Sequence, residues 1–69
     1  MIEPYSRVQL VGNKYEADCG YNGMIGYVIE SYPDGKYEVE FSNSEGISIA
    51  QFVVDEDDLI LAPEPKTKA

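Results

Sequence analysis

The chain lacks histidine and tryptophan, and it contains a single cysteine and only 5 basic residues among its 69. Without histidine it has neither the commonest general base of enzymes nor the commonest ligand of transition metals. One cysteine cannot form an internal disulfide, so we expect a protein of a reducing compartment whose stability comes from packed side chains. These absences exclude a histidine-dependent enzyme and a disulfide-stabilised small domain.

Long apolar runs are also missing. No stretch approaches the ~20 residues needed to span a bilayer, and the first residues, Met-Ile-Glu-Pro-Tyr, lack the basic and apolar regions of a signal peptide. We therefore expect a cytoplasmic protein with no membrane partner.

The charge balance is strongly acidic, with 13 acidic residues against 5 basic ones and a net charge of −8. Such a chain repels the phosphates of nucleic acids, whereas it attracts basic protein surfaces. The composition therefore predicts a basic protein partner and no nucleic acid.

Catalytic and metal-binding patterns are not found. Cys19 has no histidine partner, so we interpret it as a buried or incidental thiol. The acidic run 55–58 lacks the alternating ligands and central glycine of a calcium-binding EF-hand loop, and we interpret it as a solubilising turn. Glu38 and Glu40 lie two residues apart and are more typical of solvated charges than of an acid–base pair. We expect no enzyme activity, no cofactor and no metal.

The most regular segment is 23–41, in which two apolar-rich strands flank Pro33-Asp34-Gly35. This tripeptide is typical of a tight turn, because proline presets φ and glycine accepts a positive φ. After the turn the side chains alternate with period two. The alternation predicts a half-buried strand with one inward row, formed by Tyr37, Val39 and Phe41.

Turn signals at short intervals predict five strands. Their expected positions are about 6–11, from 23 onward, 36–42, 47–54 and 59–62. We expect Gly26 to mark a bulge or a sharp bend in the second strand. In the fourth we expect Ile47, Ile49 and Phe52 to point inward. The segment 13–22 is predicted to be a long exposed loop, and 55–58 a short 3₁₀ turn.

The tyrosines are assigned to two groups. Tyr5, Tyr32 and Tyr37 are expected to pack in the core or across strands. The other three are expected to remain partly exposed, and they are Tyr15, Tyr21 and Tyr27.

These features together predict an all-β fold, a small five-stranded SH3-like barrel over residues 1–62, followed by a disordered tail over 63–69. This architecture is favoured by the long first loop, the glycine in the second strand and the 3₁₀ turn before the fifth strand. The missing tryptophan argues against a polyproline-binding SH3 domain, and the few basic residues argue against an RNA- or DNA-binding barrel.

Four short motifs also resemble those of a known family. The motifs are Arg7-Val8-Gln9-Leu10, Gly23-Met24-Ile25-Gly26-Tyr27-Val28-Ile29-Glu30, Tyr37-Glu38-Val39-Glu40-Phe41 and Asp58-Leu59-Ile60. The set is similar to the V-x-L, G-x-x-G-x-V, Y-x-V-E-F and D-L pattern of small uncharacterised bacterial SH3-like domains. This chain departs from the pattern at Met24 and Tyr27, where a polar residue and a threonine are common. Some members lie beside polymorphic toxin genes, and the resemblance therefore implies an immunity protein.

Charge, size and the missing catalytic residues lead to one functional hypothesis. The protein is an immunity or antitoxin protein that covers the active-site cleft of a cognate toxin, for which a basic nuclease is the best candidate. Six residues are the expected contacts, namely Tyr21, Tyr27, Glu38, Glu40, Asp55 and Asp57.

Two other roles remain open. The chain is then either an accessory SH3-like subunit that docks on a larger complex, or a module that binds a peptide or a methylated cation between its tyrosines.

Overall fold

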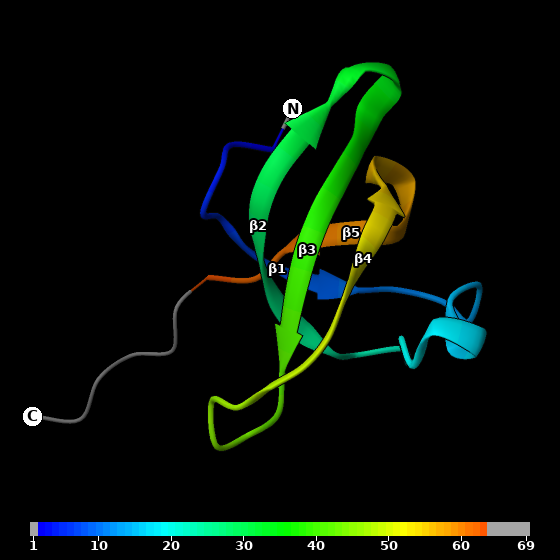
Figure 1. The fold of residues 1–69 in the computed structure, drawn as a ribbon. Helices are drawn as coiled ribbons and strands as arrows, with labels where there is room; N and C mark the ends of the chain where they lie inside the picture. The colour runs from blue at the N-terminus through cyan, green and yellow to red at the C-terminus, as the bar shows by residue number, and fades with distance from the viewer. Residues whose placement is uncertain (1, 64–69) are drawn as a thin grey trace, which may run out of the picture.

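The computed structural model describes residues 2–63, which form one antiparallel sheet of five strands in the order β4-β3-β2-β1-β5 (Figure 1). The strands are β1 (Arg7–Leu10), β2 (Ile25–Tyr32), β3 (Lys36–Ser42), β4 (Ser48–Asp55) and β5 (Leu59–Leu61). Three 3₁₀ turns connect them, η1 (Glu16–Asp18), η2 (Pro33–Gly35) and η3 (Glu56–Asp58). The prediction of an all-β fold with five strands is confirmed. The sheet is open, with β4 and β5 at its edges, and the predicted tail beyond Pro63 lies outside the described residues.

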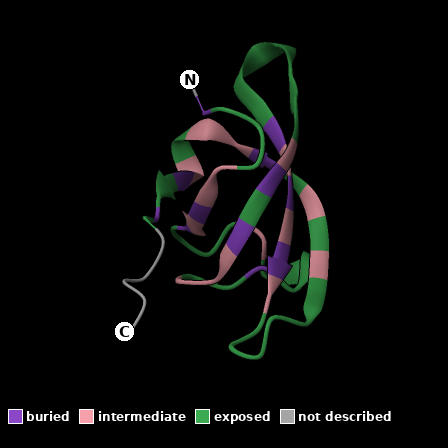
Figure 2. Ribbon diagram, turned by 90° about the vertical axis from the view of Figure 1, so that its left-hand side faces the viewer, coloured by how far each residue is buried: buried purple, intermediate pink, exposed green. Residues whose placement is uncertain are grey.

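The sheet folds over on itself because the long strand β2 serves two partners. Its first residues pair with β1, and its whole length pairs with β3. In Figure 1, β1 and β5 consequently pass behind β3 and β4. The space between these two layers holds the buried side chains, and Figure 2 marks the buried positions on the ribbon in purple. The largest fully buried ones are Phe41, Leu10, Val8, Val28, Val39 and Val54.

Strand β3 lies at the centre of this core. Tyr37, Val39 and Phe41 are only 3%, 0% and 0% exposed, so their predicted inward orientation is confirmed. β3 has a neighbour on each side and one face on the core, and such a strand shows a clean period-two pattern.

The sequence predicts a bulge or a sharp bend at Gly26, but the bulge of β2 lies further along the strand. The register between β2 and β3 shifts between Val28 and Glu30. Gly26 instead marks a close approach of two strands, because a Cβ there would lie 2.6 Å from the Glu40 carbonyl oxygen. Glycine is needed at this position because any larger side chain would meet the neighbouring backbone.

The prediction for β4 was wrong at two positions. Ile47 and Ile49 are 57% and 51% exposed rather than inward. The pairing with β3 shifts here, since Phe41 lies opposite Ala50 whereas Ser42 lies opposite Ser48. Because Ala50 pairs with the buried Phe41, alternation along β4 places Ile49 on the outer face, and Ile47 precedes the strand. The inward row of β4 is therefore Ala50, Phe52 and Val54.

Two of the tyrosines expected to pack in the core or across strands lie at the surface, although Tyr32 contacts Glu38 on the neighbouring strand. Tyr5 is 77% exposed in the turn before β1, and Tyr32 is 38% exposed at the end of β2. Tyr37 is buried as expected, and its hydroxyl accepts a hydrogen bond of 3.0 Å from the Ile2 N–H. Cys19 is exposed, so it is not a buried thiol.

Candidate functional site

The outer face of the sheet carries polar side chains over β2, β3 and β4. Residues that lie opposite each other in antiparallel strands share a face, and their side chains are close enough to interact. Three rows of cross-strand neighbours result, Tyr27–Glu40–Gln51, Glu30–Glu38–Val53 and Tyr32–Lys36–Asp55. Tyr27, Glu38 and Glu40, three of the predicted contact residues, therefore belong to one surface. We call Tyr27, Glu30, Tyr32, Glu38, Glu40 and Gln51 the acidic face.

Glu38 is fixed in place by two neutral donors. The Tyr32 hydroxyl donates to Glu38 Oε1 at 2.9 Å, and Gln51 Nε2 donates to Oε2 at 3.0 Å. These bonds, first from Gln51 and then from Tyr32, lower the pKa of the Glu38 carboxyl. Donating to Glu38, beside the charge of Glu30, raises the pKa of the Tyr32 phenol. Glu38 is thus held as an oriented, ionised carboxylate at neutral pH.

The acidic face lacks positive charge at its centre. Glu30 lies directly opposite Glu38 across the two strands. Glu40 accepts a hydrogen bond from the Ser48 hydroxyl. Among residues 2–63, no lysine or arginine forms an ion pair with any of these three glutamates. Neutral groups therefore position the Glu38 and Glu40 carboxylates.

A hollow of about 610 Å³ adjoins the acidic face near the β3–β4 turn. Tyr27 and Glu40 line it together with Arg7. The Arg7 guanidinium is engaged elsewhere, because it donates to the carbonyl oxygens of Ala62 at 3.3 Å and Pro63 at 2.7 Å. The remaining lining residues are Gly23, Met24, Ile25, Ser42, Asn43, Ser44, Gly46 and Ser48.

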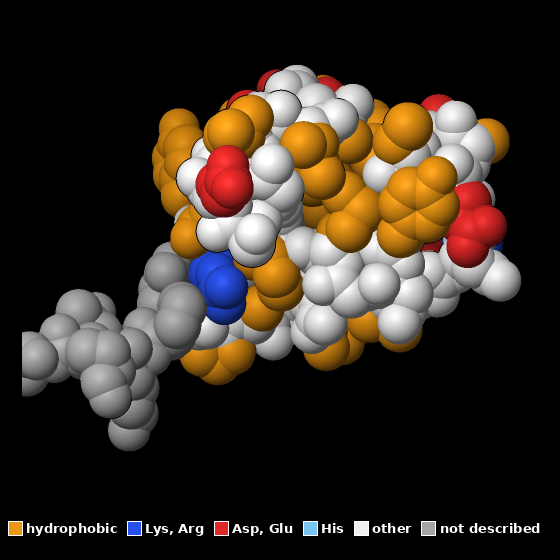
Figure 3. Space-filling model, turned by 90° about the horizontal axis from the view of Figure 1, so that it is seen from below, with side chains coloured by type: hydrophobic (Ala, Val, Ile, Leu, Met, Phe, Trp, Pro, Cys, Tyr) orange, Lys and Arg blue, Asp and Glu red, His pale blue; other side chains and the backbone are white. Residues whose placement is uncertain are grey.

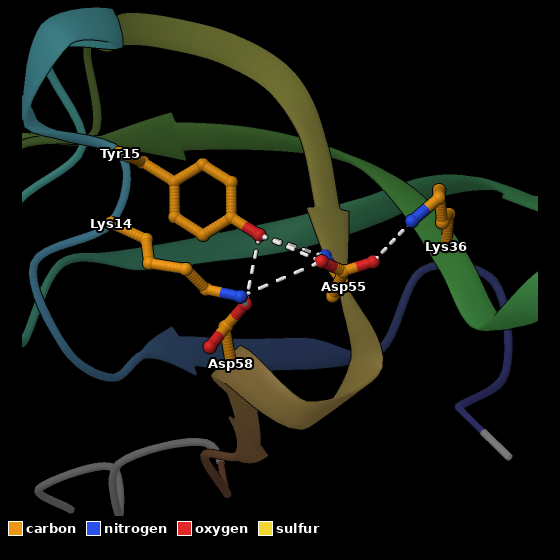
Figure 4. Close-up of polar contacts among 5 residues, drawn as sticks. All are labelled: Lys14, Tyr15, Lys36, Asp55 and Asp58. Carbon is orange, nitrogen blue, oxygen red and sulfur yellow. Dashed lines mark hydrogen bonds and ion pairs between the residues drawn. The ribbon is translucent and has the colours of Figure 1, made fainter.

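The acidic residues at the end of β4 are in a different setting, shown in Figure 4. Lys14 Nζ lies 2.9 Å from Asp58 Oδ2 and 3.6 Å from Asp55 Oδ2, and Lys36 binds the other oxygen of Asp55. The Tyr15 hydroxyl donates to Asp58 Oδ2 at 2.8 Å and accepts the Asp55 N–H at 3.1 Å. This network joins the β1–β2 loop to β4 and η3.

The network shifts several pKa values. The hydrogen bond from Lys36 is the main cause that lowers the pKa of Asp55, and the pKa of Lys36 is raised in turn. The hydrogen bond to Asp58 raises the pKa of Lys14, and partial burial raises that of Tyr15. Two lysines thus contact Asp55, and one of them, Lys14, is shared with Asp58.

The six predicted contact residues consequently fall into three places. Tyr27, Glu38 and Glu40 share the acidic face. Asp55 and Asp57 line a smaller hollow of about 200 Å³ beside η3, together with Lys14, Asp34, Gly35 and Glu56. Tyr21 is 52% exposed in the β1–β2 loop, where its N–H contacts Met24 Sδ.

Sequence reasoning missed the neutral residues that position the charges. Tyr32 and Gln51 orient Glu38, yet neither belongs to a charge motif. The strand register would have found them, because the turn at 33–35 sets Lys36 opposite Tyr32 and so places this tyrosine near Glu38.

The end of the molecule seen from below is less charged. In Figure 3 apolar side chains gather across the middle of this view, whereas acidic ones lie near its margins. Isoleucines 47 and 49 are among the exposed apolar residues of the chain. The molecule therefore presents apolar side chains beside the strongly charged ones.

Two further observations concern the described part of the chain alone. In residues 2–63, no group of three or more potential ligands is arranged to hold a metal ion. No helix there combines the length and the apolar character required to cross a membrane.

Comparison with known families identifies one match. DUF4926, a domain of unknown function, matches residues 5–61. No curated protein and no solved structure matches the chain.

Proposed function

Because the chain belongs to the DUF4926 family of domains of unknown function, we propose its role from its own surface: it is a binding protein whose acidic face docks on a basic protein. One observation carries the proposal. Glu30 and Glu38 lie opposite each other with no cation among their contacts in residues 2–63. Like charges at such positions destabilise a sheet. A cationic partner offsets this repulsion, so relief of the repulsion between the two carboxylates contributes to the binding free energy.

The best-supported partner is a toxin, which makes the protein an immunity protein or antitoxin. A nuclease that binds phosphates needs a basic cleft, and an acidic domain of net charge −8 is complementary to it. Complementary fields can raise association rates to ~10⁸–10⁹ M⁻¹s⁻¹. Tyr27 and Tyr32, 39% and 38% exposed, add aromatic contact area beside the carboxylates.

We also propose that the fold is an SH3-like barrel. The strand order β4-β3-β2-β1-β5, the long β1–β2 loop and the 3₁₀ turn before β5 support it. In this architecture the outer face of β2–β3–β4 stays free for a partner, while the inner face holds the core.

Co-expression with the product of the neighbouring reading frame tests the proposal. That product is expected to stop growth when expressed alone and to be harmless in the presence of this protein. The double variant Glu38→Lys/Glu40→Lys is expected to lose protection. The control Glu16→Lys/Asp18→Lys changes the charge equally on the exposed η1 turn and is expected to retain protection. Equal protection by both variants would refute docking through the acidic face, and a non-toxic metabolic enzyme as the neighbour would refute immunity.

An accessory docking subunit, or a module for a peptide or methylated cation, is the second candidate. The exposed apolar side chains of β4 and β5 favour it, among them Ile49, Val53, Ile60 and Leu61. Binding through apolar groups depends little on salt. Attraction between the acidic face and a basic partner, in contrast, is screened by salt, since the Debye length is ~10 Å at 0.1 M. Partner affinity that stays constant from low to high salt would therefore favour this second role.

A further inference from the structure

Strand β4 is an edge with a free side. It pairs with β3 over its eight residues, Ser48–Asp55. In residues 2–63, no backbone hydrogen bond outside the sheet ladders involves positions 48–54. The free side of β4 therefore offers unpaired N–H and C=O groups to another chain.

The contact between Asp55 and Tyr15 shows which backbone N–H and C=O groups of β4 point to the free side. The Asp55 N–H points away from β3, because it donates to the Tyr15 hydroxyl. Along an antiparallel strand, residues alternate between those that bond the neighbour and those that do not. Val53 and Gln51 therefore also direct their N–H and C=O groups to the free side. Tyr15 occupies the end of the row and limits an added strand to the residues before Asp55.

The composition of this edge is unusual for an exposed strand. Proteins protect free edges with lysine, proline, bulges or short strands. The other edge follows this rule, because β5 has three residues and Arg7 covers the Ala62 and Pro63 carbonyls that follow it. Residues 46–54, Gly-Ile-Ser-Ile-Ala-Gln-Phe-Val-Val, include no charged residue and no proline. Only the register shift near Ser48 interrupts this edge.

The charges around β4 select the kind of strand that can bind. Val53 and Gln51 lie opposite Glu38 and Glu40 on the acidic face. A sixth strand beside β4 would place every second side chain on that face, next to Gln51 and Val53 and two strand spacings, roughly 9–10 Å, from β3. From there only long side chains, such as those of lysine and arginine, reach the two carboxylates. A second copy of this protein would instead extend the sheet with its own glutamates and a further net charge of −8. Charge complementarity therefore favours a basic strand over self-association.

We infer that the free side of β4 binds an extended segment of the basic partner as an added sixth strand, with lysine or arginine at alternate positions whose long side chains reach across β4 toward Glu38 and Glu40. The inference rests on the proposed function and specifies its contact. Backbone hydrogen bonds to Gln51 and Val53 hold the segment, and the acidic face selects its charge.

Hydrogen exchange of single amides tests strand addition directly. The probe is a capped peptide as long as the eight-residue β4, with alternating lysine and valine. Without peptide, the Gln51 and Val53 amides are expected to exchange fast, whereas those of Phe52 and Val54 are protected by β3. With peptide, the Gln51 and Val53 amides are expected to become protected, and the other two to change little.

A matched peptide separates strand addition from simple charge attraction. It has the same sequence and charge, but alternate backbone nitrogens on the edge that would face β4 are methylated. It is expected to bind about tenfold more weakly or worse, because it lacks the N–H groups of the ladder. If both peptides bind equally and Gln51 and Val53 stay unprotected, strand addition is wrong while docking on the acidic face survives. If neither peptide binds at low salt, the inference is also wrong.

A variant of the strand gives a second readout. Val53→Pro removes an N–H that points to the free side, which edge strands tolerate. It is expected to lose peptide binding while the amides of Phe52 and Val54 remain protected, and the control Val53→Thr is expected to bind as the parent does. Unchanged binding by a folded Val53→Pro would overturn the inference. Concentration-dependent protection of Gln51 and Val53 without peptide would assign the edge to a second copy, which also overturns it.

Discussion

Glu30 and Glu38 lie directly opposite each other across β2 and β3, on the outer face of the sheet. Their neighbour Tyr32 donates its hydroxyl hydrogen to Glu38 and feels the charge of Glu30, which contributes to its raised pKa. The sheet therefore carries an unfavourable pair in the middle of its most polar surface.

Glu30→Lys is expected to stabilise the free protein. The change replaces a repulsive cross-strand pair by an attractive one, and such pairs contribute roughly 0.2–1 kcal/mol each. Urea unfolding at low salt measures the gain, which should shrink at high salt. Glu16→Lys makes the same charge change away from the sheet. An equal gain in this control would attribute the effect to net charge alone.

The same substitution should weaken partner binding, because it places a positive charge on the acidic face. Stability and affinity are thus expected to change in opposite directions. A Glu30→Lys protein that is both more stable and fully protective would contradict the proposed role of this face.

Gly26→Ala is expected to destabilise the fold by about 1–3 kcal/mol or more, as overpacking of a filled core does. Its Cβ would lie 2.6 Å from the Glu40 carbonyl oxygen and 2.8 Å from Phe41 Cδ1. Neither atom can move without disturbing β3. The control Ser31→Ala, at an exposed position of the same strand, should leave the urea midpoint nearly unchanged. Similar midpoints for both variants would show that the two strands can separate at low cost.

Tyr15→Phe should cost about 1–3 kcal/mol, because the part-buried Asp55 N–H loses its acceptor. The ring itself remains, stacked on Phe52 at a centroid distance of 5.5 Å. Thermal unfolding measures the loss. Tyr21→Phe removes a hydroxyl from an exposed residue and should be close to neutral. A neutral Tyr15→Phe would mean that water replaces the hydroxyl.

Asp55→Asn should reveal a pH window. The pKa of Asp55 is lowered from 3.8, mainly by the hydrogen bond from Lys36, and that of Lys36 is raised from 10.5 by the same bond. The lowered pKa stabilises the fold above pH 3.8, and this contribution is lost as the pH falls through the folded value. The raised pKa stabilises the fold below pH 10.5, and this contribution is lost as the pH rises through the folded value.

The advantage of the parent over Asp55→Asn is therefore expected to be largest at neutral pH and to fall on both sides. Urea unfolding at acidic, neutral and alkaline pH checks this shape. The measured quantity is the difference between the two proteins, so other titrating groups largely cancel. If the difference in unfolding free energy does not depend on pH, the ion pair between Asp55 and Lys36 does not contribute to the stability of the fold.

Burial could be predicted from the sequence where the alternation of apolar and polar residues within a single strand is sufficient. β3 packs one face on the core and has partners on both sides, so its alternation determined Tyr37, Val39 and Phe41 without further information. The prediction failed at Ile49, because hydrophobicity alone favours this residue over Ala50 as the inward one. The register with β3 sets Ala50 opposite the buried Phe41, so alternation turns Ile49 outward, and this register depends on the neighbouring strand.

In the candidate site, too, local features could be predicted from the sequence, whereas contacts between distant residues could not. The outward direction of Glu38 and Glu40 followed from the period of β3 alone. The contact of Tyr15 with Asp58 joins residues 43 positions apart, and no local pattern encodes it. Pairing of Asp55 with Lys14 and Lys36 likewise depends on how the loop folds back. An acidic run in a sequence thus does not reveal which of its charges are already neutralised.

The position of β1 has a consequence for biosynthesis. β1 lies between β2 and β5, so Val8 pairs with Gly26 on one side and with Leu61 on the other. A ribosome makes β1 early, whereas its second neighbour emerges some fifty residues later, after all other strands. Until then, one side of β1 has no partner. Pairing of β1 with β5 also requires closing a long loop, which slows folding. The nascent chain therefore completes its sheet only after β5 has been made and has left the ribosome.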